Sequence, residues 1–125
     1  MSNGILAMRE IKFRGWDSTG QKGWVTGDLV HAKGISKDSD EDLFDRIMVG
    51  GYEVVPESVG QLTGLNDITG REIYEGDVVR YDDVLSDDNE VIETVVFEDG
   101  CFWPVSESWA TNIEVIGTVY EQNNK

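Results

Sequence analysis

One stretch near the middle of the chain, residues 59–81, constrains the fold more than any other. It reads V-G-Q-L-T-G-L-N-D-I-T-G-R-E-I-Y-E-G-D-V-V-R-Y and holds two turns followed by an apolar run. Residues 66–70 favour a turn, because Asn and Asp side chains bond to nearby backbone and Gly70 can adopt a positive φ. Gly76-Asp77 predicts a second bend. The β-branched and aromatic residues that follow suit a half-buried strand.

Strand and turn patterns also fill the N-terminal half. Residues 11–14 alternate apolar and charged side chains, which is the period of a strand with one buried face. Residues 17–23 are rich in turn formers and precede a second strand-like run at 24–31, so a hairpin with a long loop is expected. Residues 33–45 are polar and acidic and are interpreted as a solvated loop. A short helix over 43–48 and a strand beginning at 46 both remain open.

The C-terminal half shows the same spacing. Residues 91–98 and 101–103 flank Asp99-Gly100, the clearest hairpin turn in the chain. Residues 113–120 predict a last strand, with Gly117 at a bulge or a close backbone contact. Pro56 has no N–H to donate and marks a boundary between strands.

These patterns predict a mostly β protein. The expected architecture is an N-terminal β lobe over residues 8–72, packed on a small SH3-like barrel over residues 73–121. Residues 1–7 are expected to be a disordered extension, with Met8 as an alternative start, and residues 122–125 a frayed tail. A single compact domain is the alternative, since 125 residues suffice for one core.

Composition restricts the compartment. The chain has one cysteine, Cys101, so it forms no internal disulfide, and a reducing, cytoplasmic location is expected. No run approaches the roughly 20 apolar residues that cross a bilayer, and residues 1–7 are too short and uncharged for a secretory signal. No membrane association is therefore expected.

The formal net charge of −15 is unevenly distributed. Residues 1–37 hold six Lys/Arg and three Asp/Glu, a net of +3, so the remainder carries −18. Direct binding to nucleic acid is disfavoured, because affinity for phosphate backbones depends on cationic side chains that displace counterions. The acids keep the chain in solution or, in a sharper interpretation, imitate a nucleic acid or dock a basic partner.

Candidate chemistry is sparse. His31 is the only histidine, and with one histidine and one cysteine a four-ligand N/S zinc site is excluded. Glu98 and Asp99 beside Cys101 disfavour a thiolate nucleophile. The acidic runs 38–45 and 82–88 lack the twelve-residue calcium-loop layout, which leaves only opportunistic divalent binding. We expect no cofactor, no metal site and no catalytic residues.

Tryptophans supply the best candidate contact surface. Aromatic side chains dominate both cores and interface hot spots, so each tryptophan is either a core residue or part of a binding surface. The four candidates for a protein interface are Trp16, Trp24, Trp103 and Trp109.

Three separated motifs resemble the YopX family. They are Arg9-Glu-Ile-Lys-Phe-Arg-Gly-Trp16, then Val59-Gly-Gln-Leu-Thr-Gly-Leu65 with Gly70-Arg-Glu-Ile-Tyr-Glu-Gly-Asp-Val-Val79, and finally Glu114-Val-Ile-Gly-Thr-Val-Tyr-Glu121. The resemblance covers roughly residues 8–121. It implies a β-rich, phage-encoded protein of Gram-positive bacteria, oligomeric and made in the host cytoplasm. It implies no known activity and no catalytic residues.

These observations lead to three hypotheses about the function. The leading hypothesis is a non-enzymatic phage accessory protein that binds another protein or assembles with itself as a homo-oligomer. The second is an acidic nucleic-acid mimic that inhibits a host DNA-binding protein. The third is an enzyme for a small molecule, which requires folding to bring together carboxylates such as Asp28, Glu57, Glu75 and Asp77.

Overall fold

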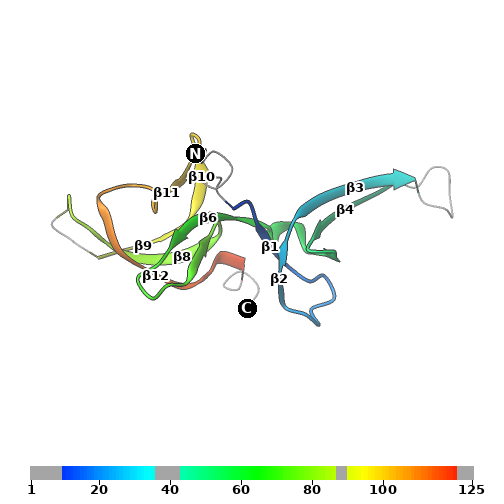
Figure 1. Cartoon of the computed structure of the whole chain (residues 1–125), viewed down its shortest axis with the longest axis horizontal. Coiled ribbons are helices and arrows are strands. Elements are labelled where there is room, and N and C mark those ends of the chain that lie inside the picture. Colours follow the sequence, from blue (N-terminus) through cyan, green and yellow to red (C-terminus); the bar gives the residue numbers. More distant parts are fainter. Residues whose placement is uncertain (1–9, 36–42, 87–89, 121–125) are drawn as a thin grey trace, which may run out of the picture. The chain divides into compact units, whose positions relative to one another are not determined.

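The computed structural model describes residues 10–35, 43–86 and 90–120 (Figure 1). The chain divides into two compact units, an N-terminal unit of residues 12–61 and a C-terminal unit of residues 1–11 with 62–125. The described residues are mostly β-strand, which confirms the predicted fold class. The division between the units follows Gln61, inside a strand, whereas the sequence predicts a boundary after residue 72.

The N-terminal unit is built from two antiparallel arrangements. β1 pairs with β2 on one side and with the start of β6 on the other. β3 pairs with β4, and β4 with β5. The predicted boundary at Pro56 is confirmed, because Pro56 begins a short 3-10 helix. The elements are β1 (Phe13–Trp16), β2 (Trp24–Gly27), β3 (Leu29–Ile35), β4 (Leu43–Val49), β5 (Tyr52–Glu53), η1 (Pro56–Ser58) and β6 (Gly60–Asn66), whose later residues belong to the C-terminal unit.

Two predictions in this unit are wrong in detail. The predicted strand 24–31 is divided at Asp28, where Gly27 and Gly50 approach so closely that a Cβ on Gly27 would lie 2.7 Å from the Gly50 Cα. The predicted loop 33–45 is strand at both ends, because β3 and β4 pair from Leu29 with Val49 to Ile35 with Leu43. Cross-strand pairing stabilises these two strand ends, and local composition does not report it. Residues 36–42 lie outside the described part of the chain.

The C-terminal unit contains three antiparallel arrangements. β8 lies between β12 and β9, β10 forms a hairpin with β11, and the later residues of β6 pair with β7. The predicted hairpin turn at Asp99-Gly100 is confirmed, as both residues have the positive φ that this turn requires. The strands are β7 (Glu72–Tyr74), β8 (Asp77–Asp83), β9 (Glu90–Thr94), β10 (Val96–Glu98), β11 (Cys101–Trp103) and β12 (Ala110–Thr118).

The SH3-like detail of the prediction is not confirmed. Among the described residues, the sheets of the C-terminal unit stay separate and none closes into a barrel. The run 91–98, predicted as one strand, is divided at Val95. The Val95 N–H donates to the Asp77 carbonyl at 2.8 Å, and the Gly76 N–H donates to the Val95 carbonyl at 2.8 Å. These bonds let β9 continue along β8 while β10 leaves to pair with β11.

Two bulges shape β12. The register with β8 shifts between Val115 and Gly117, which confirms the predicted irregularity at Gly117. A second shift falls between Thr111 and Glu114, where Asn112 has a φ of 55°. The long last strand therefore bends twice along β8.

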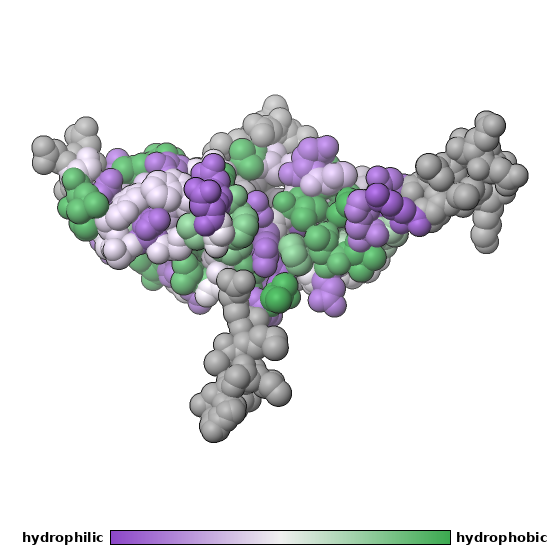
Figure 2. All heavy atoms as spheres, turned by 90° about the horizontal axis from the view of Figure 1, so that it is seen from above, coloured by the Kyte–Doolittle hydropathy of each residue, from purple (hydrophilic) through white to green (hydrophobic). Residues whose placement is uncertain are grey.

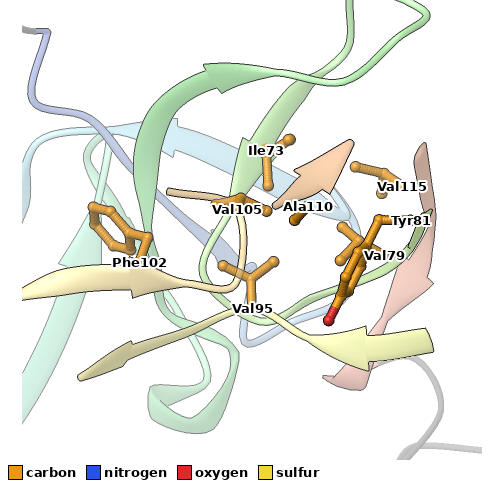
Figure 3. Close-up of a cluster of buried hydrophobic side chains, with 8 residues drawn as sticks. All are labelled: Ile73, Val79, Tyr81, Val95, Phe102, Val105, Ala110 and Val115. Atoms are coloured by element: carbon orange, nitrogen blue, oxygen red, sulfur yellow. The ribbon is translucent and has the colours of Figure 1, made fainter. Parts of the chain in front are cut away.

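The hydrophobic core lies in the C-terminal unit. Figure 3 shows its side chains converging from several strands, with the Tyr81 ring beside Val79. Trp109 and the partly buried Val91 pack against this cluster. In the N-terminal unit, by contrast, Val49 and Val54 are the buried hydrophobic residues among the described side chains. The core cluster is Ile73, Val79, Tyr81, Val95, Phe102, Val105, Ala110 and Val115.

Candidate functional site

Two of the candidate tryptophans meet on one face of the N-terminal unit. Trp16 of β1 is the direct cross-strand partner of Trp24 of β2, and their rings pack edge to face with centroids 5.4 Å apart. Arg14 precedes Trp16 by two residues, so its side chain leaves the same face of β1. Its guanidinium carbon lies 4.6 Å from the centroid of the Trp24 ring. We call Arg14, Trp16 and Trp24 the aromatic–cation face.

A hydroxyl group fixes the end of β1 that carries this face. The Trp16 N–H donates to Ser58 Oγ at 2.7 Å, and that hydroxyl donates to the Val55 carbonyl at 2.6 Å. The Val55 N–H in turn donates to the Trp16 carbonyl at 2.9 Å. Ser58 is buried in η1, so the short helix sets the position of Trp16.

Gly15 lies between Arg14 and Trp16 and faces the other side of β1. A Cβ built on Gly15 would lie 2.8 Å from the Val54 Cβ, closer than real side chains approach. Val54 is buried against that side of β1 and is bridged to Asp17. The side of β1 opposite to Trp16 is therefore packed.

The loop from Asp17 to Gly23 is held by one buried carboxylate. Asp17 accepts hydrogen bonds from the Lys22 N–H at 3.0 Å and the Thr19 hydroxyl at 2.8 Å. These two bonds, the Lys22 one first, lower the pKa of Asp17 below its ordinary value. The loop so formed places the Lys22 ammonium 5.7 Å from the centroid of the Tyr52 ring, a second cation–aromatic pair.

This arrangement suits protein recognition. Trp16 and Trp24 are half-buried and Lys22 and Tyr52 are exposed, whereas Arg14 is buried beneath the Trp24 ring at 7% exposure. Tryptophan, tyrosine and arginine are the residues that most often dominate binding energy at protein interfaces, because they offer large rigid surfaces with polar edges. None of Arg14, Trp16 and Trp24 is a nucleophile or a general base.

The other two candidate tryptophans lie in the C-terminal unit. Trp103 and Trp109 pack edge to face with centroids 5.1 Å apart, and Trp109 lies 6.1 Å from the ring of Tyr81. Trp109 also packs against the core cluster. The structure therefore brings the four candidates together as two pairs, one in each unit. The core accounts for Trp109, and an interface role for all four stays a prediction.

The carboxylates of the enzyme hypothesis differ in their surroundings. Asp28 and Glu57 belong to the N-terminal unit and are exposed. Asp77 is fully buried in the C-terminal unit, where it accepts a hydrogen bond from the Tyr74 N–H at 2.8 Å. That hydrogen bond fixes the turn before β8. Glu75 lies in this turn and is half-buried. Asp77 thus has a structural task.

The remaining candidates show ordinary contacts. His31 pairs with Asp45 on the exposed surface of the β3–β4 hairpin. Cys101 is half-buried, and its thiol donates to the Glu98 carbonyl at 3.5 Å. Within residues 10–35, 43–86 and 90–120, no three metal-ligating side chains cluster. Most of the acidic run 38–45, and the end of the run 82–88, lie outside the described residues.

Two hollows in the C-terminal unit were not anticipated from the sequence. One, of about 430 Å³, is polar and is lined by Asp82, Asp83, Val84, Thr111 and Asn112. The other, of about 420 Å³, lies between β6 and the β10–β11 hairpin. The role of Arg14 was also missed, although its period-two spacing from Trp16 was a readable signal. In the part of the chain that is described, no helix has the length and apolar character of a membrane span.

The fold and the site define a mostly β protein of small antiparallel sheets with a pair of packed tryptophans in each unit. The chain belongs to the YopX protein family, whose model matches residues 12–125, and the resemblance predicted from the motifs is thereby confirmed. Its structure is similar to the crystal structure of protein EF1440 from Enterococcus faecalis, with a TM-score of 0.53 and 20% identity. The likeness covers 93% of this chain and 97% of that one and concerns the fold alone. A comparison with curated proteins gave no match.

Proposed function

We propose that this YopX-family chain is a phage accessory protein without enzymatic activity, which binds another protein or further copies of itself. The observation that carries the proposal is the aromatic–cation face, where the half-buried rings of Trp16 and Trp24 pack edge to face and Arg14 lies against the Trp24 ring. Membership of the YopX family supports the phage setting, which the resemblance of the three motifs implies.

The composition of the N-terminal unit supports a contact role. A unit of about fifty residues buries little apolar surface by itself and gains stability from association. Here the described side chains include two buried hydrophobic residues, Val49 and Val54, while Leu29 and Val30 of β3 are exposed. Figure 2 shows hydrophobic residues gathered over the part of this unit that holds β3 and β4. β3 is also the edge of its sheet, and an open edge strand favours pairing with another chain.

Light scattering over a range of protein concentrations, at low and high salt, tests self-association. Where the wild type is monomeric, it serves as bait for host proteins, and a retained partner is purified for direct titration. Trp24→Ala is expected to weaken either contact about tenfold, the loss typical of an interface aromatic. Thr26→Ala is the matched control, since Thr26 is exposed on the same face of β2. A monomer at every concentration, with no partner whose retention depends on Trp24, overturns the proposal.

A nucleic-acid mimic is the second candidate, and the charge distribution favours it. Residues 62–125 hold fifteen Asp/Glu and three Lys/Arg, so this segment accounts for −12 of the net charge of −15. Such a field repels DNA and attracts DNA-binding surfaces. A mimic displaces DNA from a host restriction or transcription factor at low salt and loses this effect at high salt. Failure to displace DNA at low salt excludes this candidate and leaves the first one intact.

A further inference from the structure

The hollow between β6 and the β10–β11 hairpin is lined mainly by apolar surface. Its volume of about 420 Å³ falls within the range of roughly 300–1,000 Å³ that ligand sites occupy. One wall is formed by Thr63, Gly64 and Leu65 of β6. The other is formed by Phe97, Cys101 and Phe102 of the hairpin.

The walls of this hollow are fixed by the fold. The Thr63 hydroxyl donates to the Ile73 carbonyl at 2.8 Å and accepts a hydrogen bond from the Leu65 N–H at 3.1 Å. Gly64 between them has a φ of 86°, and the β6–β7 register shifts across this segment. Opposite, Phe102 is anchored in the core cluster. The recess is therefore preformed, which lowers the ordering cost of binding.

The opening is flanked by apolar side chains. Phe97 is 51% exposed although its ring packs edge to face on Phe102 at 5.0 Å, and Leu65 is 41% exposed. A bulky apolar group placed in the hollow would contact Phe97, Leu65 and the Phe102 ring together. Removing these surfaces from water favours such an occupant.

The surrounding charge selects the kind of molecule that brings this group. Glu98 and Asp99 are exposed and lie between Phe97 and Gly100 in the sequence, next to the lining but not part of it. Among the described residues of the C-terminal unit the cations are Arg71 and Arg80, and Arg80 already contacts Glu114 and Glu90. An uncharged small molecule would leave these two neighbouring carboxylates unused. A peptide segment with Lys or Arg beside its apolar side chain would match both features.

We propose that this hollow binds one bulky apolar side chain from a basic segment of a protein partner, with its flanking cations against Glu98 and Asp99. The site lies within the C-terminal unit and uses none of the residues of the aromatic–cation face. The two proposals can therefore fail separately.

The test is a titration of the full chain, labelled with nitrogen-15, with the acetylated and amidated pentapeptide Lys-Lys-Phe-Lys-Lys. Saturable shifts are expected at the amides of Leu65, Phe97 and Gly100. Phe97→Ala should raise the Kd about tenfold. Glu98→Gln combined with Asp99→Asn should weaken binding and reduce its salt dependence. Asn suits position 99, because its φ of 51° lies in the left-handed region that Asn tolerates.

Control peptides and variants separate binding in this hollow from nonspecific attraction between opposite charges. The same peptide with Ser at its centre, and one with Glu in place of Lys, should leave these amides unshifted, and Trp24→Ala should bind like the wild type. Unchanged core amides in Phe97→Ala establish that the variant folds. The proposal is overturned if the basic peptide produces no saturable shift, or if the acidic peptide binds equally well. A shift of these amides with protein concentration alone would indicate that a second copy of the chain occupies the hollow, and it also overturns the proposal. So does peptide binding that occurs only after residues 1–9 are deleted.

Discussion

At the residue scale, buried aspartates organise the turns of this protein. Asp67 is 7% exposed and accepts hydrogen bonds from the Thr69 hydroxyl at 2.6 Å and the Arg71 N–H at 3.0 Å. Its second oxygen accepts from the Val115 N–H at 2.9 Å. One carboxylate therefore joins the turn after β6 to the middle of β12.

Asp67 should make stability depend on acid. Burial raises its pKa, but the bonds from Thr69, Val115 and Arg71 outweigh burial and lower the pKa from 3.8 to about 2. Because the folded pKa is the lower one, the stabilisation is complete above about pH 4 and is lost as the pH falls towards 2. Asp67→Asn should lower the free energy of unfolding at neutral pH by about 1–3 kcal/mol. Urea unfolding at several pH values should show this difference shrinking below about pH 4.

Asp99→Asn serves as the control, since Asp99 is exposed in a hairpin turn. Its difference from the wild type should stay small at every pH. A constant difference for Asp67→Asn down to about pH 2 would contradict the assignment.

Two adjacent glycines offer a matched test of backbone packing. Gly50 and Gly51 both have positive φ, at 59° and 88°, so a side chain is strained at either position. A Cβ on Gly50 would also lie 2.3 Å from the Thr26 carbonyl oxygen, whereas one on Gly51 meets nothing within 4 Å. Gly51→Ala should cost about 1 kcal/mol and Gly50→Ala at least about 2 kcal/mol more. Chemical unfolding followed by tryptophan fluorescence measures both, and equal losses would contradict the close approach.

At the element scale, η1 acts as a clamp on β1. Ser58→Ala removes the acceptor of the Trp16 N–H and the donor to the Val55 carbonyl. Loss of these two hydrogen bonds should lower the free energy of unfolding by about 1–3 kcal/mol, while the Val55 carbonyl keeps its bond from the backbone N–H of residue 58. Ser18→Ala is the control, because Ser18 is exposed in the neighbouring loop. Near-ultraviolet circular dichroism should also change for Ser58→Ala, since Trp16 loses its anchor, and an unaltered spectrum would argue against the clamp.

The sequence predicted the positions of turns and strands better than it predicted which strands pair with each other. Local signals located the turns at 66–70, Gly76-Asp77 and Asp99-Gly100, because Asp, Asn and Gly shape the backbone near themselves. The division of the run 91–98 at Val95 depends on hydrogen bonds to Gly76 and Asp77, about twenty residues away, which no local pattern reports. The strand character of residues 33–35 likewise depends on pairing with β4. For the site, the tryptophans were identified, but the Trp16–Trp24 pair follows from the β1–β2 register and the Trp103–Trp109 pair from the path of the loop between β11 and β12.

At the scale of the whole molecule, the two units differ in how much apolar surface they bury. The C-terminal unit holds the core cluster, whereas the described buried hydrophobic residues of the N-terminal unit are Val49 and Val54. Amide hydrogens that exchange with solvent only when a large part of the structure unfolds should therefore be found mainly in the C-terminal unit. In native-state hydrogen exchange we expect Val79 and Tyr81 of β8 to be better protected than residues of β3. Equal protection in both units would contradict this expectation.

β6 has a further consequence for anyone who wishes to produce the halves separately. The division between the units falls inside this strand, after Gln61, and β6 runs through it without a flexible linker (Figure 1). Gly60 and Gln61 pair with β1, while Leu62 and Asn66 pair with β7. A truncation at the boundary would cut a hydrogen-bonded strand and expose a new edge on each fragment. Shortened versions of this protein should keep β6 whole, and inserted tags belong in exposed turns instead.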